Sequence, residues 1–192
     1  MHTAKELFLS EQDYLTGEET AEFKHEYING EVWAMVGASD AHVTIAMNLA
    51  FLLKQKLKDS PCRSYISDMK VKVASANAYF YPDVLVSCEQ KDKQNTHYKE
   101  YPVFIAEILS PSTEAYDRGD KFKLYRQLAS LEEYWLIDAQ KMSLDCFTRQ
   151  QNNDWSLHSY EQASQIPQLP TLKLSIQLTD LYESVLDLPQ AG

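Results

Sequence analysis

Four segments decide the fold of this chain: YPDVLVS (81–87), VFIAEILSPST (103–113), EAYDRGDKFKLYRQL (114–128) and EEYWLID (132–138). The first, second and fourth are short apolar runs, rich in β-branched and aromatic residues and bounded by Pro, Ser and Asp. This pattern is typical of strands that are buried on both faces. The third segment is predicted to form a helix. We expect the rest of the chain to be organised around these elements.

Each of the first two predicted strands carries a carboxylate at a position that should be buried. Counting by two along each strand places Asp83 and Glu107 among side chains that are packed away from water. A buried carboxylate is costly unless it is paired, hydrogen-bonded or bound to a metal. Asp117, Lys121 and Tyr125 recur every four residues on one face of the following helix. Together these residues predict a shared site.

The residue types at this site suit metal-assisted phosphodiester chemistry. Asp83 and Glu107 offer oxygen ligands, and Mg²⁺ commonly takes one or two carboxylates while waters and substrate phosphates fill its other positions. Such a cation would lower the pKa of a bound water and neutralise charge that develops on a phosphodiester. Lys121 could stabilise that charge or orient the attacking water. A structural ion pair between buried acids and a lysine is the alternative interpretation.

Length and composition bound the class of protein. At 192 residues, with 44% hydrophobic and 11% aromatic side chains, we expect one globular domain over residues 1–192. The chain has no apolar run near the ~20 residues that span a bilayer and no signal-peptide pattern at its start, so we expect no membrane association and a cytoplasmic location. Cys62, Cys88 and Cys146 are odd in number and far apart, which predicts reduced, half-buried thiols.

Net charge is the strongest argument against an enzyme that acts on nucleic acid. The charge of −10 and the pI near 4.9 oppose a chain-wide attraction to nucleic acid. Basic residues nevertheless gather in one part of the chain: Lys54, Lys56, Lys58, Arg63, Lys70 and Lys72. This run is interpreted either as a local basic face or as a solvated helix end and strand edge.

The remaining elements are predicted from turn, cap and periodicity signals. Asn29-Gly30 indicates a tight turn, Ser39 is a good N-cap for a helix on which His42 faces the core, and Thr179 is predicted to cap the last helix. The polar stretch 89–102 is expected to be an exposed loop that tolerates change. The expected elements are helices at 3–15, 18–27, 40–58 and 116–128, strands at 31–36, 63–74, 80–88 and 102–109, an antiparallel extension of strands at 132–138, 142–149 and 154–160, and a final strand and helix within 166–186.

The chain resembles a known family in three blocks: FKHEYINGEVWAMVGASDAH (23–42), YPDVLV (81–86) and IAEILSPSTEAYDRGDKFKLYRQLASLEEYWLID (105–138). These blocks are similar to the Uma-type family of restriction-endonuclease-like proteins, a branch of the PD-(D/E)xK nuclease superfamily. The pairing of PDV with EILSPST and a downstream D-R-x-x-K is quite specific to this family. The resemblance implies an α/β (α+β) fold with a restriction-endonuclease-like mixed central β-sheet flanked by helices. It also implies that acidic residues bind Mg²⁺ to hydrolyse a phosphodiester bond.

Carried over by position, the resemblance assigns roles to individual residues. Asp83 matches the acid of the PD motif and Glu107 the acid of the (D/E)xK motif, so both are expected to be metal ligands. Glu26 matches a glutamate on an N-terminal helical segment that often completes the acidic cluster. His42 matches a histidine that recurs in this branch.

The chain departs from the superfamily pattern at one position. The motif lysine should stand two residues after Glu107, where this chain has Leu109, which cannot supply a cation. The resemblance implies that Lys121 reaches the same spot from the following helix. Tyr125, one turn further on, is interpreted either as a hydrogen-bonding residue of the site or as a packed side chain.

Three functions compete at this stage. The first is an Mg²⁺-dependent endonuclease, with Mn²⁺ as an alternative metal, that acts on DNA rather than RNA and forms a homodimer, as the resemblance implies. The second is a binding or assembly module that keeps the nuclease fold without catalysis, which a Lys121 paired on the surface away from Asp83 would favour. The third is a metal-dependent hydrolase of a smaller phosphorylated substrate, which a narrow, closed pocket would favour.

Overall fold

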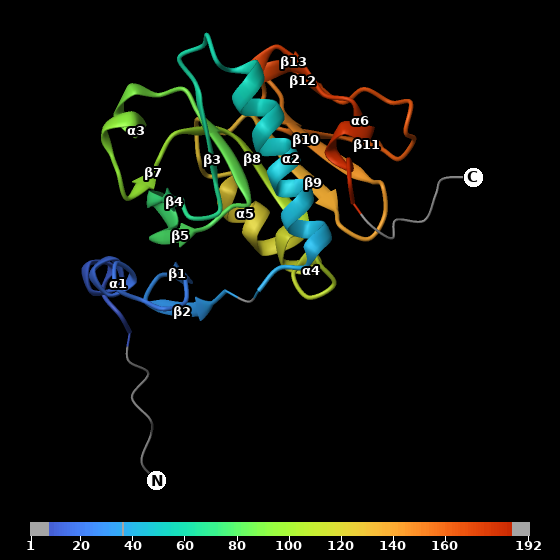
Figure 1. Cartoon of the computed structure of the whole chain (residues 1–192). Helices are drawn as coiled ribbons and strands as arrows, with labels where there is room; N and C mark the ends of the chain where they lie inside the picture. Colours follow the sequence, from blue (N-terminus) through green and yellow to red (C-terminus); the bar gives the residue numbers. More distant parts are fainter. Residues whose placement is uncertain (1–7, 36, 186–192) are drawn as a thin grey trace.

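A six-stranded mixed sheet forms the centre of the fold (Figure 1). The computed structural model describes residues 8–35 and 37–185. The strand order is β11-β10-β9-β8-β6-β3, and only β8 and β9 run parallel to each other. The strands are β3 (Arg63–Ile66), β6 (Val84–Ser87), β8 (Pro102–Leu109), β9 (Glu133–Asp138), β10 (Leu144–Arg149) and β11 (Trp155–Tyr160). The predicted mixed sheet with an antiparallel extension is therefore confirmed.

Two smaller sheets accompany the central one. The five-stranded sheet has the order β2-β1-β5-β4-β7, and its β4 and β5 share a hydrophobic core with β6, β8 and β9. β12 and β13 form a short hairpin that leads into the last helix. The strands are β1 (His25–Ile28), β2 (Glu31–Ala34), β4 (Lys70–Val73), β5 (Ala78–Phe80), β7 (Tyr98–Lys99), β12 (Gln168–Leu169) and β13 (Leu174–Ser175).

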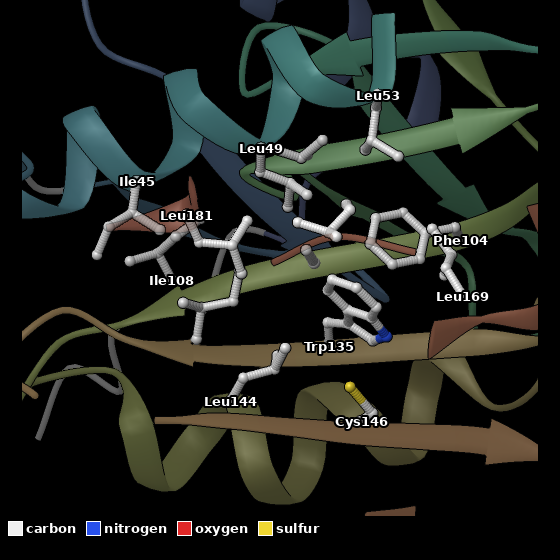
Figure 2. Close-up of a cluster of buried hydrophobic side chains, with 14 of the residues drawn as sticks. Ile45, Leu49, Leu53, Phe104, Ile108, Trp135, Leu144, Cys146, Leu169 and Leu181 are labelled. Carbon is white, nitrogen blue, oxygen red and sulfur yellow. The ribbon is translucent and has the colours of Figure 1, made fainter. Parts of the chain in front are cut away.

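Helix α2 (Asp40–Lys56) covers one face of the central sheet. The side chain of Ser39 accepts the N–H of His42 at 3.3 Å, as expected for the predicted N-cap. Ile45, Leu49 and Leu53 are fully buried on one side of α2 and point toward the sheet, where Phe104 and Trp135 lie (Figure 2). This apolar face fixes the helix on the sheet, so the start of α2 is held at one end of it.

A broken helical segment covers the opposite face of the sheet. It consists of α4 (Glu114–Tyr116), a π-helical turn η2 (Asp117–Lys121) and α5 (Phe122–Tyr125), where one helix over 116–128 was predicted. Phe122 and Tyr125 pack in the core that α5 shares with β8 and β9. The segment therefore brings the polar side of η2 to the same end of the sheet as the start of α2.

The first predicted helix is only partly correct. The structure has one N-terminal helix, α1 (Glu11–Glu18), capped by Ser10, instead of a helix over 3–15. Residues 3–7 of that prediction lie outside the described residues. Phe8, which falls inside the predicted helix, precedes α1 and is 63% exposed. The cap at Ser10 explains the late start, because its side chain satisfies a backbone N–H that an earlier start would use.

The second predicted helix, over 18–27, is wrong. Glu26 lies on β1, which pairs with β2 and β5. Tyr27 of this strand packs in an aromatic cluster with Tyr14 and Tyr79, and that tertiary packing outweighs local helix propensity. Glu26 is therefore presented by a strand rather than by a helix.

The strands predicted at 63–74 and 80–88 are each divided between the two larger sheets. β5 ends at Phe80 in the five-stranded sheet, and β6 begins at Val84 in the central sheet. The chain crosses between the sheets at Tyr81–Asp83, where Pro82 has no N–H to give to a ladder. Asp83 therefore stands at the junction of the sheets and not inside a strand.

The stretch 89–102 is not a simple exposed loop. It forms α3 (Gln90–Gln94) and β7, and both Asp92 and Lys99 are buried. The Asp92 carboxylate accepts a hydrogen bond from the hydroxyl of Ser87 at 2.6 Å and from the N–H of Tyr101 at 3.0 Å. Because a buried carboxylate needs these partners, this stretch should tolerate less change than predicted.

The prediction of three reduced thiols is wrong for two of them. Cys62 and Cys88 form a disulfide, whereas Cys146 is free and buried. The pairing follows from strand register, since Arg63 of β3 lies opposite Ser87 of β6 and the cysteines occupy the next position on each chain. Only the tertiary pairing of the strands reveals it.

The C-terminal helix α6 (Leu178–Leu181) is short. Its N-cap is Gln177, which makes no capping bond through its side chain, so the predicted cap at Thr179 is wrong. Within residues 8–35 and 37–185, no helix has both the length and the apolar character needed to cross a membrane.

Candidate active site

Asp83 and Glu107 lie side by side where β6 begins and β8 approaches its end. The Asp83 carboxylate accepts the N–H of Ile108 at 2.7 Å and contacts Nε2 of His42 at 2.8 Å. The Glu107 carboxylate in turn accepts the N–H of Asp83 at 3.4 Å. These contacts fix both acids relative to the sheet and place the first turn of α2 beside them.

Lys121 enters the site from the π-helical turn and contacts three carboxylates. Its Nζ lies 2.9 Å from Glu26, 3.0 Å from Glu107 and 3.6 Å from Asp117. The lysine side chain is only 7% exposed. The ammonium group that was predicted to reach the acids from the helix is therefore found against Glu107, inside the protein and not on its surface.

The shape of the helical segment explains how these groups meet. Asp117 and Lys121 begin and end the π-helical turn, and Tyr125 ends α5, so the three side chains share the face predicted from their spacing. The Tyr125 hydroxyl donates a hydrogen bond to Glu107 at 2.9 Å. π-Helical turns are rare and often occur at functional sites, because they re-aim side chains that a regular helix would place differently.

The site holds more negative than positive charge. Burial raises the pKa of Glu107 well above its ordinary value. The charge of Lys121 opposes this rise, whereas the charges of Asp117 and Asp83 add to it. Burial also raises the pKa of Asp117. Burial alone would lower the pKa of Lys121, but Glu107, Glu26 and Asp117 outweigh it and raise that pKa. Lys121 is therefore charged, and a bound cation would relieve the excess of carboxylates around it.

Asp83 and Glu107 fit a hard divalent cation. A carboxylate has about four lone-pair sites, and the contacts of Asp83 and Glu107 leave lone pairs on both. No group of three or more His, Cys, Asp or Glu side chains is arranged to hold a metal among the described residues. Two carboxylates supplemented by waters are nevertheless a common set for Mg²⁺.

All five residues predicted for the site line one cleft of about 1200 Å³: Glu26, His42, Asp83, Glu107 and Lys121. This volume exceeds the roughly 300–1,000 Å³ of typical small-molecule pockets. Leu109, which replaces the motif lysine, is buried in the hydrophobic core. The cleft therefore gathers the predicted side chains and leaves the substituted motif position outside.

The sequence placed Asp117 on the helix face of the predicted site, beside Lys121, but it was not predicted as a catalytic or metal-binding residue. Asp117 is buried and lies within 3.6 Å of the lysine. The four-residue spacing of acid and lysine gave its position, and the structure adds that its carboxylate is an ion-pair partner of Lys121.

Comparison with known proteins places the chain in a family. The sequence model of Uma2, described as "Putative restriction endonuclease", matches residues 11–180. The chain belongs to this family. The Uma2 match includes all five predicted site residues, so the geometry described above lies within the part of the chain that defines the family.

Two proteins of Synechocystis sp. (strain ATCC 27184 / PCC 6803 / Kazusa) are similar to this Uma2 chain over most of their length. "Uncharacterized protein slr1290" is 36% identical over 177 residues, which cover 92% of this chain and 93% of that protein. "Uncharacterized protein sll1609" is 35% identical over 159 residues, which cover 82% of this chain and 90% of that protein.

A solved structure shares the fold of this Uma2 chain. The crystal structure of a "putative nuclease belonging to DUF820" from Anabaena variabilis ATCC 29413 superposes with a TM-score of 0.76 at 16% identity. The superposition covers 93% of this chain and 99% of the other. The predicted restriction-endonuclease-like fold is thus confirmed.

Proposed function

We propose that this Uma2 protein is an endonuclease that hydrolyses phosphodiester bonds in DNA with the help of Mg²⁺, for which Mn²⁺ can substitute. One observation carries the proposal: a buried, charged lysine contacts the carboxylate of Glu107, and Glu107 is hydrogen-bonded to Asp83. Metal-assisted phosphodiester hydrolysis needs carboxylates with free lone pairs next to an ammonium group. Membership of the Uma2 family supports the same chemistry.

The side chains divide the work of this reaction. Asp83 and Glu107 would hold the cation, which when bound lowers the pKa of water and neutralises charge on the phosphate. Lys121 keeps its proton because the surrounding carboxylates raise its pKa, so it stabilises negative charge on the phosphate and does not act as a base. His42 positions Asp83 through their 2.8 Å contact. Tyr125 positions Glu107 through its hydroxyl.

The other two functions receive less support from the geometry. A binding module without catalysis would be favoured by a Lys121 paired on the surface, but Lys121 is buried against Glu107. A small phosphorylated substrate would be favoured by a narrow pocket, but the cleft has a volume of about 1200 Å³. The buried lysine favours a catalytic site over a binding module, and the volume of the cleft favours a substrate larger than a small molecule.

A cleavage assay tests the proposal. We expect the wild type to cut DNA with Mg²⁺ or Mn²⁺ and not with chelator. Asp83→Asn and Lys121→Met should lose about 10²-fold or more, the order expected when an electrostatic group of an active site is removed. Asp120→Asn and Lys123→Met are matched controls, because these side chains are exposed on the same helical segment. No cleavage by the wild type, or equal cleavage by all variants, contradicts the proposal.

Assembly as a homodimer and a cytoplasmic location stay predictions. Light scattering tests the first, with an expected mass of twice 22.1 kDa. A mass of 22.1 kDa at all concentrations would contradict it.

A further inference from the structure

An exposed apolar surface forms one side of the cleft. We call it the apolar wall; its members are Trp33 on β2, Val43, Met47 and Phe51 on α2, and Ile66 on β3. Met47 and Phe51 are each 62% exposed, and Trp33 is 46% exposed. Single exposed apolar side chains are common, but several gathered along one cleft mark a binding surface. Since the candidate catalytic residues line the same cleft, the apolar wall is continuous with the active site.

Two members of the apolar wall stand directly beside the catalytic groups. Trp33 is the cross-strand partner of Glu26, and directly opposite residues in an antiparallel pair project to the same face. The carboxylate of Glu26 lies 2.9 Å from Nζ of Lys121. Glu26 is therefore the neighbour that the Trp33 indole and the Lys121 ammonium group share. Ile66 is the cross-strand partner of Val84, the residue after Asp83. A ligand in contact with the apolar wall would therefore reach the reacting groups.

The wall extends along α2 away from the site. Val43, Met47 and Phe51 follow each other at four-residue intervals on the side of α2 that faces away from the core. At 1.5 Å per residue this stripe is about 12 Å long, which matches three to four stacked nucleotide steps at about 3.4 Å each. Lys54, on the same side of the helix, ends the stripe and also lines the cleft. The stripe thus offers apolar contacts followed by one positive charge.

The charges in the cleft disfavour a DNA duplex. Among the described residues, the lysines that line it are Lys54 and Lys121, and the latter is engaged with three carboxylates. The acids that line the cleft are Glu26, Asp68, Asp83, Glu107 and Asp117. A duplex carries one negative charge per about 1.7 Å and presents its phosphates outward. In this cleft those phosphates would lie next to carboxylates, which repel them, and next to apolar side chains, which cannot solvate them. A single strand carries half that charge density and can turn its bases toward the protein.

We propose that the apolar wall binds single-stranded DNA by its bases, so that unpaired strands are the substrate of the active site. The proposal rests on the nuclease function proposed above. Trp33 and Phe51 offer rings on which any base can stack, and Val43, Met47 and Ile66 offer apolar atoms to the deoxyribose sugars between the bases. Lys54 contacts a phosphate at the far end of the bound segment. Stacking is independent of sequence, so we expect little sequence preference.

The apolar wall also favours DNA over RNA. A ribose carries a 2′-hydroxyl that donates and accepts hydrogen bonds, whereas deoxyribose does not. Val43, Met47 and Ile66 have no polar group on their side chains that could satisfy such a hydroxyl. An RNA strand in the same position would lose the hydration of its hydroxyls without compensation.

Fluorescence anisotropy tests the proposal with a short labelled DNA strand, the same strand in a duplex and an RNA strand of the same sequence. Ca²⁺ replaces Mg²⁺ so that the probes are not cut. We expect the single strand to bind at least about tenfold more tightly than the duplex or the RNA. Trp33→Ala and Phe51→Ala should each weaken binding of the single strand about 5- to 150-fold, the factor that corresponds to stacking of one base. Trp33→Phe should retain most of the binding, because it keeps a ring.

Leu157→Ala is the matched control, because Leu157 is 54% exposed on β11 and does not line the cleft. All substituted side chains are exposed, so unfolding temperatures close to the wild type are expected. Equal binding of duplex and single strand, equal binding of RNA, or unchanged binding by both Ala variants overturns the proposal. The proposal is also overturned if light scattering shows a dimer that Phe51→Ala dissociates, because a second copy of the chain would then occupy the apolar wall.

The outcomes also separate this proposal from the proposed function. If single strands bind through Trp33 but are never cut with Mg²⁺ or Mn²⁺, the nuclease function fails and the binding surface stands. If a duplex is cut preferentially and Asp83→Asn abolishes the cleavage, the nuclease function stands and the preference for single strands fails.

Discussion

Replacing Lys121 by methionine tests the charge balance on which the active site depends. Methionine keeps a long, flexible side chain and removes the ammonium group. In the wild type three carboxylates lie within 3.6 Å of Nζ, and the lysine side chain is 7% exposed. Removing one partner of a buried ion pair costs about 3–5 kcal/mol of unfolding free energy. For a chain of this length that lowers the unfolding temperature by about 6–20 °C.

The loss of stability in Lys121→Met should depend on pH. Burial raises the pKa of Glu107 and Lys121 opposes that rise, so without the lysine the pKa of Glu107 rises further. A carboxyl whose pKa is raised in the folded state stabilises the protein while it is protonated and costs stability as pH rises through that pKa. The difference in stability between wild type and variant should therefore narrow as pH falls from about 8 to about 5.

Thermal and urea unfolding at several pH values measure these differences. The double variant Lys121→Met/Glu107→Gln should recover about 0.5–3 kcal/mol relative to the sum of the single changes, because it removes an acid along with its partner. Lys123→Met, an exposed neighbour on the same segment, should change stability by less than about 0.5 kcal/mol. A Lys121→Met protein as stable as the wild type, or a difference that is the same at all pH values, would refute the reasoning.

Three further changes probe other parts of the fold. Burial raises the pKa of Glu133, so the free energy of unfolding should fall as pH rises from the ordinary carboxyl pKa toward the raised one. Glu133→Gln should reduce this fall, as thermal melts between about pH 5 and pH 8 would show. The disulfide joins residues 26 positions apart, so dithiothreitol should lower stability by about 3–4 kcal/mol in the wild type and have little effect on Cys62→Ser, as urea unfolding would show. Asp92→Ala should cost about 1–3 kcal/mol or more, because it leaves the N–H groups of Glu100 and Tyr101 without their acceptor, and an unchanged urea midpoint would contradict this.

Elements governed by local pattern were predictable from the sequence. Ser39 and the apolar side of α2 give a capped amphipathic helix whatever it packs against. The apolar runs of β8 and β9 are strands because both of their faces are covered. The spacing of Asp117, Lys121 and Tyr125 placed them on one face, and the structure brings Lys121 and Tyr125 to Glu107 and Asp117 to Lys121.

Elements governed by long-range partners were not predictable. Tyr27 belongs to a strand because of rings contributed from distant parts of the chain, and Cys62 meets Cys88 only after β3 and β6 pair. The stretch 89–102 looked exposed because its composition is polar, yet Asp92 is buried and accepts hydrogen bonds from Ser87 before it and from Glu100 and Tyr101 after it. Periodicity describes one segment at a time, and these features are properties of pairs of segments.

The same distinction applies to the active site. Residues alone indicated Asp83, Glu107 and Lys121, whereas Glu26 and His42 came from the family resemblance. The structure places Glu26 against Lys121 but on a strand instead of a helix. The apolar wall was not predicted, because exposed apolar positions in separate elements carry no signal until the fold places them along one cleft.

The most direct test of the account is a calorimetric titration of Mg²⁺, and then Mn²⁺, into the wild type, Asp83→Asn and Asp120→Asn. If the paired acids hold a divalent cation, the wild type and Asp120→Asn should bind one ion with equal affinity, and Asp83→Asn should bind it at least about tenfold more weakly. Proton release on binding should accompany the wild-type signal, because burial raises the pKa of Glu107 and a ligand must be deprotonated. Equal affinity of all three proteins, or no binding by the wild type, would contradict the central claim.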